Sequence, residues 1–500
     1  MFTFLFFVGL LIVGYIVWGK ISERIFVIKP EAVTPAYSMQ NGVDFVPMPK
    51  WRLILLQLIN IAGTGPIFGA IAGALFGPAA FAWIVFGCIF AGAVHDYTVS
   101  MLSLRNKGAH ISDLVGKYLG RKPIYIMRAF SLVLLIFVGV VFTTTPAMVL
   151  QTLLAGFWDF AANVQFRNIL LAAIFAYFIL ATMLPVDKLI GRIYPLAGAV
   201  MIFMGVGMFV MLFATGDVRN IPEFSFTNMR PDSEVNIMAR IFPFLFITIA
   251  CGAISGFHAT QAPIVARCLQ NEKHGRSVFY GAMILEGVVA MIWAAVVMGH
   301  FTHVGTATAI AAPVIVTQSA MAYLGAVGGI LAVIGVAFFP ITSGDTAFRS
   351  ARLLIADALK IDQKPIKNRL IVALPLFGVG LALVLFAIAD AANFGIIWRY
   401  FAWSNQTLAT VGLWTAAAYL AKSGKQYWLA LVPATFMTSV VTSYFFTATE
   451  TLGPIMTGIT GNAEITYVIG LVVGIGLAAL LFVLFVTQVG IKQKGTLQDE

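Results

Sequence analysis

Charged residues are scarce in this sequence: Asp, Glu, Lys and Arg make up 10% of its 500 residues, whereas 60% are hydrophobic. So little charge cannot cover the surface of a water-soluble globular protein. The composition therefore excludes that class and indicates a polytopic membrane protein. The longest polar segment is 215–240, and no stretch suggests a soluble domain.

Cysteines are also few. Cys88, Cys251 and Cys268 lie in or beside apolar stretches, and their spacing provides neither a disulfide framework nor a paired set of metal ligands. The sequence has no phosphate-binding loop, which removes support for ATP-driven pumping. We therefore expect no cofactor and no metal centre of the paired-cysteine kind.

Long apolar runs are what the sequence does contain. Thirteen runs of about 20 apolar residues, bounded by charged or turn residues, predict membrane-spanning helices. The first begins at Phe2 without a preceding basic segment, so we interpret it as a retained helix and not a cleaved signal. The predicted spans are 2–18, 53–76, 79–104, 123–148, 168–185, 191–214, 241–266, 278–299, 319–346, 369–389, 396–420, 427–447 and 465–489.

The distribution of basic residues supports this topology. With the N-terminus outside, 26 of the 31 lysines and arginines fall in segments on the cytoplasmic side, as the positive-inside rule requires. The net charge of +10 therefore reflects membrane topology and does not indicate a nucleic-acid partner. On the same side, apolar residues at helical spacing predict a short interfacial helix over 111–119.

The span 53–76 is interrupted at Gly63-Thr64-Gly65-Pro66. Proline removes a backbone donor and glycine adds no stiffness, so we expect the helix to break there. The freed backbone groups cannot face lipid and must face protein, water or a ligand. The alternative is a simple proline kink. A glycine at every fourth position beyond the break predicts a bare face that another backbone can approach: Gly65, Gly69, Gly73 and Gly77.

A second interrupted span, 241–266, contains Gly252, Gly256 and Pro263. It comes five spans after the first, and an odd offset reverses the orientation in the membrane. Two broken helices at matching positions of inverted halves are typical of the LeuT-like fold of the APC superfamily, although accidental glycines are the alternative. The predicted organisation is an N-terminal helix and loop (1–52), a first five-helix repeat (53–214), an extracytoplasmic loop (215–240), a second inverted repeat (241–420) and two C-terminal helices with a short tail (421–500).

Ionisable side chains inside apolar spans cost about 2.5–3.5 kcal/mol each on insertion scales, so they are rare and usually functional. Asp96 is a candidate proton carrier, with His95 as its partner because histidine titrates near neutral pH. Glu286 stands in the middle of an apolar span, where desolvation disfavours its charged form and suits proton coupling. For each of them the alternative is a structural hydrogen bond.

A polar cluster lies at the inner end of the span 319–346. Asp345 and Arg349 are four residues apart and can pair on one helix face. Hydroxyls here, with carbonyls from the first break, are candidate ligands for Na⁺; the alternative is a salt bridge without an ion. The ion or proton candidates in this cluster are Thr342, Ser343, Asp345, Thr346 and Arg349, and the possible Na⁺ ligands are Ala62, Gly65, Thr342, Ser343 and Thr346.

The two breaks are the predicted substrate site. The N-terminus of a helix at either break offers partial positive charge to a carboxylate. His258, in the second break, is a candidate to bind that group or pass a proton, unless it only caps the broken helix. The candidate substrate-binding residues are Asn60, Gly63, Thr64, Gly65, Ser255, Gly256, His258 and Gln261.

Several strings resemble the carbon starvation protein A (CstA) family, in its shorter branch, along nearly the whole core. They are AGAVHDY (91–97), CGAISGFHAT (251–260), YGAMILEG (280–287), TSGDTAFRSARLLI (342–355) and WSNQTLA (403–409). After Gly-Phe-His this chain reads ATQAPIVAR, where longer members have a Ser/Gly/Thr-rich turn and a lysine. The resemblance implies a bacterial inner-membrane transporter linked to uptake of peptide or pyruvate under nutrient limitation.

We therefore expect a secondary transporter that imports a small carboxylate or peptide with H⁺ or, less favoured, Na⁺. A nutrient-binding sensor or channel-like protein is the alternative from another class, although no signalling domain is visible. An intramembrane enzyme that uses a histidine with a serine would need a geometry that the sequence does not reveal.

Overall fold

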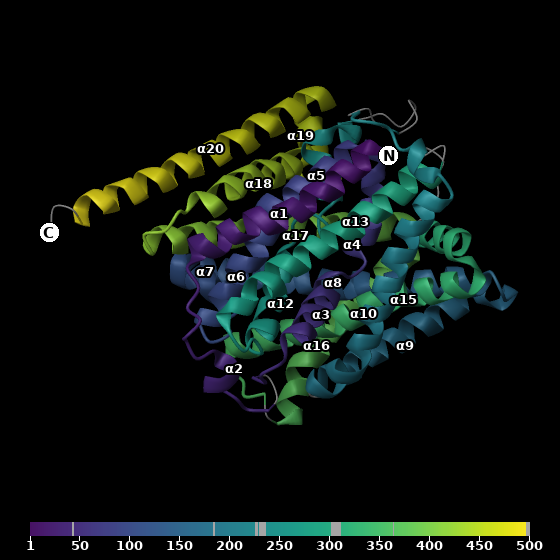
Figure 1. The fold of residues 1–500 in the computed structure, drawn as a ribbon, viewed down its shortest axis with the longest axis horizontal. Helices are drawn as coiled ribbons and strands as arrows, with labels where there is room; N and C mark the ends of the chain where they lie inside the picture. Colours follow the sequence, from purple (N-terminus) through teal and green to yellow (C-terminus); the bar gives the residue numbers. More distant parts are fainter. Residues whose placement is uncertain are drawn as a thin grey trace.

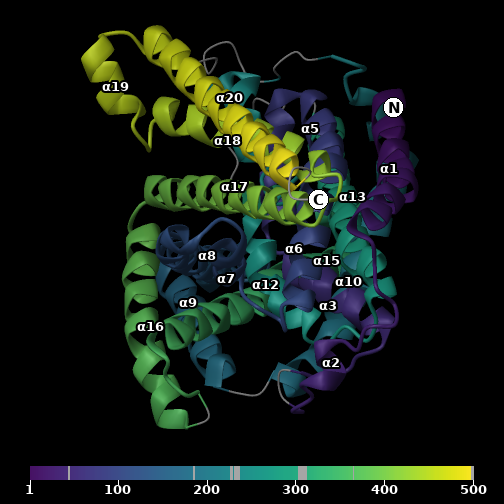
Figure 2. The same ribbon diagram turned by 90° about the vertical axis from the view of Figure 1, so that its left-hand side faces the viewer.

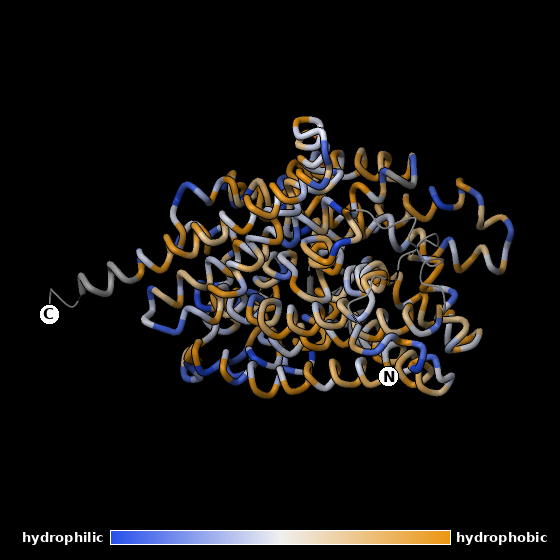
Figure 3. Tube along the Cα trace, turned by 90° about the horizontal axis from the view of Figure 1, so that it is seen from above, coloured by the Kyte–Doolittle hydropathy of each residue, from blue (hydrophilic) through white to orange (hydrophobic). Residues whose placement is uncertain are grey.

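The computed structural model describes residues 1–42, 45–183, 186–225, 229, 237–301, 312–363 and 365–496. In these ranges the chain forms helices and turns, and the only paired extended backbone is a bridge between Met48 and Leu269. The long helices lie side by side in one bundle (Figure 1), with α16 at one flank and α18 and α20 at another (Figure 2). Hydrophobic residues run along the helices, and hydrophilic ones gather at their ends and turns (Figure 3).

The first half of the chain holds the first break and the helices that surround it. Its elements are α1 (Phe2–Phe26), α2 (Pro35–Ser38), α3 (Lys50–Ile61), α4 (Gly65–Gly73), η1 (Ala74–Phe76), α5 (Ala79–Gly87), η2 (Cys88–Gly92), α6 (Ala93–Arg105), α7 (Ile111–Tyr118), α8 (Arg121–Ala155), η3 (Asp159–Ala162), α9 (Val164–Met183), α10 (Val186–Ala214) and η4 (Asp217–Asn220).

The second half holds the second break and the C-terminal helices. Its elements are η6 (Ile237–Ala239), η7 (Ile241–Leu245), α11 (Phe246–Thr248), α12 (Gly256–Ala266), η8 (Glu272–His274), η9 (Arg276–Tyr280), α13 (Gly281–His300), α15 (Ala312–Leu359), α16 (Ile366–Ala389), α17 (Ala391–Lys422), α18 (Trp428–Thr447), α19 (Gly453–Thr460) and α20 (Ala463–Thr496).

Among the described residues, 10 helices are long and apolar enough to cross a membrane, or up to 11 if the bent pair α3 and α4–η1 counts as one span. The two other predicted spans take different forms. One is α17, which has 32 residues but is not among these helices, and the other is the interrupted segment 241–266. The total of thirteen spans stays a prediction, whereas a multi-pass membrane protein is established.

The first break lies where the sequence predicts it. Helix α3 ends at Ile61, α4 begins at Gly65, and the two halves of the span are bent by 50°. Pro66 falls in the first turn of α4, where its missing N–H has no intrahelical partner to lose. The helix therefore stops before the proline, at residues 62–64, and starts again with it.

The second break lies within the predicted span 241–266 but ends before Pro263. Only two short helical turns, η7 and α11, precede it, and α12 begins at Gly256 after a non-helical stretch over 249–255. Pro263, which we expected to take part in the break, lies inside α12 without ending it. Gly252 lies in the non-helical stretch, and Ser255 is the residue that precedes α12.

The glycine face predicted on α4 packs against the second break. A Cβ at Gly65 would lie 2.4 Å from Cys251 Sγ, and one at Gly69 would lie 3.1 Å from the carbonyl oxygen of Thr248. Because side chains larger than hydrogen would not fit there, the backbones of the two broken spans approach closely. Gly77 instead has a positive φ of 62° and ends the segment.

Two predicted elements differ in extent or surroundings. The helix predicted over 111–119 is α7, but its apolar side is buried on the bundle, against α8 and α17, so it is not only an interfacial element. Helix α15 runs on to Leu359, well past the predicted end at 346, and it bends at Gly325, which has a φ of 67°. In this continuation, Arg349 is buried and donates to the Ala181 carbonyl of α9.

Candidate functional site

The polar centre of the bundle begins on α6. His95 and Asp96 lie in the first turn of α6, directly after the π-helical turn η2, and both are buried. Single π-turns inside helices are often found at functional sites because they shift the side chains that follow. The contacts around these two residues decide their role, since adjacent residues on a helix do not normally share a face.

Two further ionisable residues reach the same place from other elements. His258 lies in the first turn of α12, just after the second break, and Glu286 lies on α13, which follows the π-helical turn η9. Both side chains are buried, with 1% and 0% of their surface exposed. Each residue of the centre therefore comes from a helix that follows an irregular turn.

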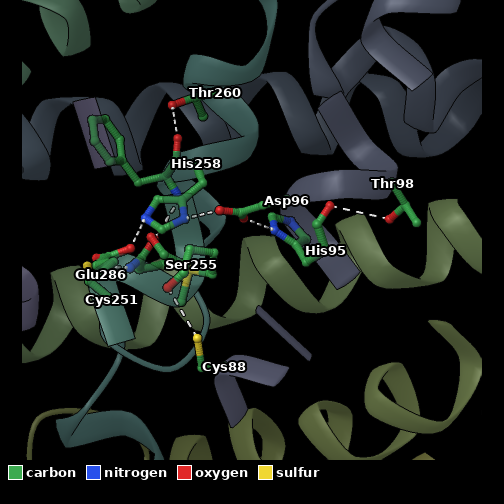
Figure 4. Close-up of polar contacts among 12 residues, drawn as sticks. Cys88, His95, Asp96, Thr98, Cys251, Ser255, His258, Thr260 and Glu286 are labelled. Atoms are coloured by element: carbon green, nitrogen blue, oxygen red, sulfur yellow. Dashed lines mark hydrogen bonds and ion pairs between the residues drawn. The ribbon is translucent and has the colours of Figure 1, made fainter. Parts of the chain in front are cut away.

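These four residues form a continuous row, which we call the His–carboxylate line (Figure 4). His95 Nδ1 lies 2.9 Å from Asp96 Oδ1, and His258 Nδ1 lies 2.7 Å from Asp96 Oδ2. On the other side of the imidazole ring, His258 Nε2 lies 3.4 Å from Glu286 Oε2. Asp96 thus bridges two histidines, and His258 stands between two carboxyl groups.

Burial makes the protonation states of this line depend on one another. An isolated charge is costly in a low-dielectric interior, whereas a paired and hydrogen-bonded charge is tolerated. Among the described residues, neither oxygen of Glu286 accepts a hydrogen bond, and His258 Nε2 has no hydrogen-bond partner. A proton that arrives between these two groups would complete a hydrogen bond, so the line has the composition of a proton-binding site.

The N-terminus of α12 is already occupied by a side chain. Asn405 of α17 accepts hydrogen bonds from the Phe257 N–H at 2.7 Å and from the Ser255 hydroxyl at 3.1 Å. Gly256 packs against the backbone of α17, because a Cβ there would lie 2.4 Å from the Asn405 carbonyl oxygen. Ser255 and Gly256, both predicted to bind substrate, therefore contact α17.

At the first break, Thr64 and Gln57 carry polar groups that have no hydrogen-bond partner among the described residues. Thr64 precedes α4, and its hydroxyl is buried with no hydrogen-bond partner among the described residues. Gln57, one turn before the end of α3, is fully buried, and neither atom of its amide has such a partner. Asn60 lies between them on α3 and is also buried. Gly63 packs closely against the Phe142 ring.

Gln261 is another residue with a buried polar atom that has no hydrogen-bond partner among the described residues. Its amide nitrogen donates to the Thr260 hydroxyl at 3.3 Å, and its buried oxygen has no partner among the described residues. It lies on α12, which packs directly against α3. Each break thus has a buried amide on an adjoining helix. Gln57 lies on α3, before the first break, and Gln261 lies on α12, after the second.

The polar cluster of α15 is a separate group. The Ser343 hydroxyl donates to the Ile59 carbonyl at 3.0 Å, which places α15 against the end of α3, while Thr342 and Thr346 donate to carbonyls of their own helix. Asp345 Oδ1 and Arg349 Nη2 are 3.5 Å apart. Within the described residues, no hydrogen bond or ion pair joins this cluster to the His–carboxylate line.

Arg349 also contacts a third helix. Its guanidinium donates to the Ala181 carbonyl of α9 at 2.6 Å, and so it fixes α15 to the end of α9. The predicted pair with Asp345 is present, but its arginine is shared with this backbone contact. Ala62, a predicted Na⁺ ligand, lies in the link between α3 and α4, three residues after Ile59, whose carbonyl accepts from Ser343.

Sequence reasoning missed three contributors. Gln57 carries a signal that could have identified it, because an amide inside an apolar span is rare. Asn405 carries the same signal, but its role as the cap of α12 depends on a contact between residues far apart in the chain. Gly412 gave none: a Cβ there would lie 2.5 Å from His95 Nε2, so this glycine makes room for the histidine ring.

Known sequences resemble this chain over most of its length. A family model described as carbon starvation protein CstA matches residues 1–165, 159–325 and 304–444. An uncharacterized membrane protein of Haemophilus influenzae is 46% identical over 341 residues, which cover 61% of this chain and 92% of the relative.

Two more distant relatives have functional names. The peptide transporter CstA of Campylobacter jejuni is 26% identical over 547 residues, which cover 85% of this chain and 77% of the relative. The pyruvate/proton symporter BtsT of Escherichia coli is 27% identical over 328 residues, which cover 54% of this chain and 45% of the relative.

Solved structures share the fold. A manganese transporter from Eremococcus coleocola superposes with a TM-score of 0.55 at 9% identity, over 90% of this chain and 99% of that one. MhsT in complex with L-phenylalanine superposes with the same TM-score at 13% identity, over 86% and 97%. The predicted LeuT-like fold is therefore confirmed, whereas identities this low carry nothing about substrate or ion.

Proposed function

This chain belongs to the carbon starvation protein CstA family, and we propose that it is a proton-coupled secondary transporter that imports a small carboxylate nutrient, either pyruvate or a short peptide. Its named relatives are transporters, so the chain is a transporter and not an enzyme. What we propose is the identity of the substrate, the identity of the coupling ion and the residues that bind them.

Proton coupling rests on one observation, the His–carboxylate line at the second break. Asp96, His258 and Glu286 come from three different helices, and one of them, α12, is half of a broken span. A change in the position of α12 would separate His258 from one carboxyl group or the other. Binding and release of a proton would thereby be linked to the movement of a helix.

The substrate would bind at the first break. The unpartnered Thr64 hydroxyl and Gln57 amide provide neutral hydrogen bonds, and the N-terminus of α4 provides partial positive charge for a carboxylate. This assignment narrows the expectation from sequence, in which either break could supply the helix N-terminus. The α12 N-terminus is less suitable because Asn405 already accepts from its Phe257 N–H.

The halves of the molecule would move against each other around this site. In this proposal residues 53–214 and 241–420 are inverted repeats, the N-terminus lies outside and the C-terminus lies in the cytoplasm of a bacterium whose inner membrane holds the protein. Rocking of the repeats would expose the first break to each side in turn. Uptake of this kind would serve a cell that lacks carbon or other nutrients.

The test is uptake by purified protein in proteoliposomes. Labelled pyruvate and a labelled dipeptide are offered separately under an inward proton gradient, an inward sodium gradient or neither, with a proton ionophore as the control. We expect one of the two solutes to accumulate above its equilibrium level under the proton gradient and the ionophore to abolish this accumulation.

Two results would contradict the proposal. Accumulation that follows only the sodium gradient would transfer the coupling role to the α15 cluster and the carbonyls of the first break. Saturable binding of a solute without accumulation under either gradient would instead favour a nutrient sensor.

A further inference from the structure

A groove at one end of the bundle joins three elements that are distant in sequence. Its volume is about 660 Å³, and it lies between the turn after α7, the end of α17 and the C-terminal part of α20. One part of the groove is cationic and polar, with Lys117, Lys422 and Gln488, and another is apolar, with Phe485 and Val489. A ligand that fills it must therefore combine an anionic group with a hydrocarbon portion.

The two lysines converge on one aromatic ring. Lys117 Nζ lies 5.5 Å and Lys422 Nζ 5.9 Å from the centre of the Tyr118 ring. Lys422 Nζ donates to the Tyr118 carbonyl at 2.9 Å, and Lys117 Nζ donates to Asn106 Oδ1 at 2.5 Å. An ammonium group has three donors, so each lysine retains two for a ligand.

Neither lysine forms an ion pair with a carboxylate in the part of the chain that the structure describes. An anion bound between the two ammonium groups would offset their mutual repulsion. Gly120, which also lines the groove, precedes α8, and the partial positive charge at the start of that helix adds to the attraction for an anion.

The apolar wall continues onto the lipid-facing surface. Helix α20 is the least buried of the candidate spans, with 17% of its apolar window inside the protein. Leu480, Val483 and Leu484, on the turns that lead to Phe485, are exposed. In a membrane these side chains contact acyl chains, so a lipid chain on α20 would extend directly into the groove.

We propose that this groove binds the phosphate head group of an anionic phospholipid, with Lys117 and Lys422 as its cationic ligands and Phe485 against an acyl chain. Basic pockets between membrane helices on the cytoplasmic side commonly bind such head groups. Lys422 ends α17, close to the predicted end of its span at 420, so the groove lies at the depth of the head groups. The bound lipid fastens α7, α17 and α20 together.

The test measures binding of phosphatidylglycerol to the full-length protein by native mass spectrometry, with phosphatidylcholine and inorganic phosphate as competing ligands. We expect Lys117→Gln/Lys422→Gln to weaken phosphatidylglycerol binding by about 30-fold, because each lysine near a membrane surface contributes about 1 kcal/mol and every 1.4 kcal/mol is tenfold in affinity. The matched control is Lys20→Gln/Lys367→Gln, which removes two exposed lysines elsewhere and should change binding less than about threefold.

A second variant separates a lipid from free phosphate. Phe485→Ala keeps both lysines and should weaken phosphatidylglycerol binding while inorganic phosphate remains a poor competitor. The proposal is overturned if phosphatidylcholine binds as tightly, if the control variant loses as much affinity, or if inorganic phosphate displaces the lipid at equal concentration. Retained solute uptake shows that each variant is folded.

Discussion

The two breaks of the bundle differ in what their polar groups contact. The first break is short, at residues 62–64, and the buried groups beside it, the Thr64 hydroxyl and the Gln57 amide, have no partner among the described residues. The second break is longer, at 249–255, and protein groups surround it. Trp83 Nε1 donates to the Ile249 carbonyl at 2.9 Å, Asn405 caps α12, and His258 joins two carboxyl groups.

This difference separates two tasks that a coupled transporter must perform. Buried polar groups without partners are costly unless a ligand or water completes their hydrogen bonds. At the first break such groups are neutral and suit a hydrogen-bonding ligand, whereas at the second they include the ionisable Glu286 and His258. Ionisable groups that contact one another across helices respond to a proton and to helix position. We therefore propose that the first break binds the substrate and that the second carries the coupling proton.

The largest expected effect comes from the second break. Asp96→Asn should lower proton-driven uptake by more than about 100-fold, because an amide oxygen cannot replace a carboxylate that bridges two imidazole rings, and proton-transfer groups are worth about 10²–10⁴ in rate. Uptake in proteoliposomes measures the change. The exposed Asp159→Asn is the control; similar losses in both variants would mean that the line has no special role.

A smaller effect should follow when His95 is displaced without altering its chemistry. In Gly412→Ala the new Cβ would lie 2.5 Å from His95 Nε2, so the ring must move, and a misplacement of about 1 Å can cost up to 100-fold in rate. We expect uptake to fall between about 10-fold and 100-fold. Gly378→Ala on α16, where nothing lies within 4 Å, should keep full activity; normal uptake by Gly412→Ala would remove His95 from the line.

Changes at the first break should affect affinity and leave coupling intact. The double variant Gln57→Leu/Thr64→Val removes two hydrogen-bonding side chains at nearly constant volume. Each lost hydrogen bond to the substrate costs about 0.5–1.5 kcal/mol of binding free energy, so KM should rise about 10-fold. The ratio of protons to substrate, from parallel pH and label measurements, should not change. Thr435→Val is the control, because the Thr435 hydroxyl donates to the Leu431 carbonyl of its own helix at 2.9 Å. A changed ratio of protons to substrate would show that the first break also takes part in proton coupling and would contradict the separate roles of the two breaks.

The smallest effect concerns stability. Asn405→Ala removes the cap of α12, and loss of an N-terminal cap costs about 0.5–2 kcal/mol, so we expect a modestly lower Tm in detergent. The Asn393 amide donates to the Phe386 carbonyl near the surface, and Asn393→Ala should change Tm less. If Asn405→Ala leaves Tm unchanged but raises substrate affinity, the α12 N-terminus is a substrate ligand after all.

The sequence predicted the elements that depend on local patterns and missed those that depend on distant contacts. Apolar runs and the Gly-Pro interruption identified the LeuT-like fold and the first break, because a membrane leaves the backbone few choices. Asp96, His258 and Glu286 were each identified as unusual ionisable residues. Their assembly was not, since Asp96 and His258 are 162 residues apart and no local pattern pairs them.

The second break shows a different limit. Pro263 gave the stronger local signal for interruption, yet it lies within α12, and the chain is non-helical before that helix. There the backbone is held by tertiary contacts from Trp83 and Asn405. Such contacts override local propensity, and they become visible only when the helices are placed together.

The central claim is that the second break carries the proton, and Glu286→Gln tests it most directly. The glutamine keeps the shape of the side chain but cannot release a proton beside His258. We predict that proton-driven accumulation in proteoliposomes is lost while counterflow exchange of the same labelled solute continues, and that the exposed Glu464→Gln behaves as wild type. Undiminished proton-driven accumulation by Glu286→Gln would contradict the account.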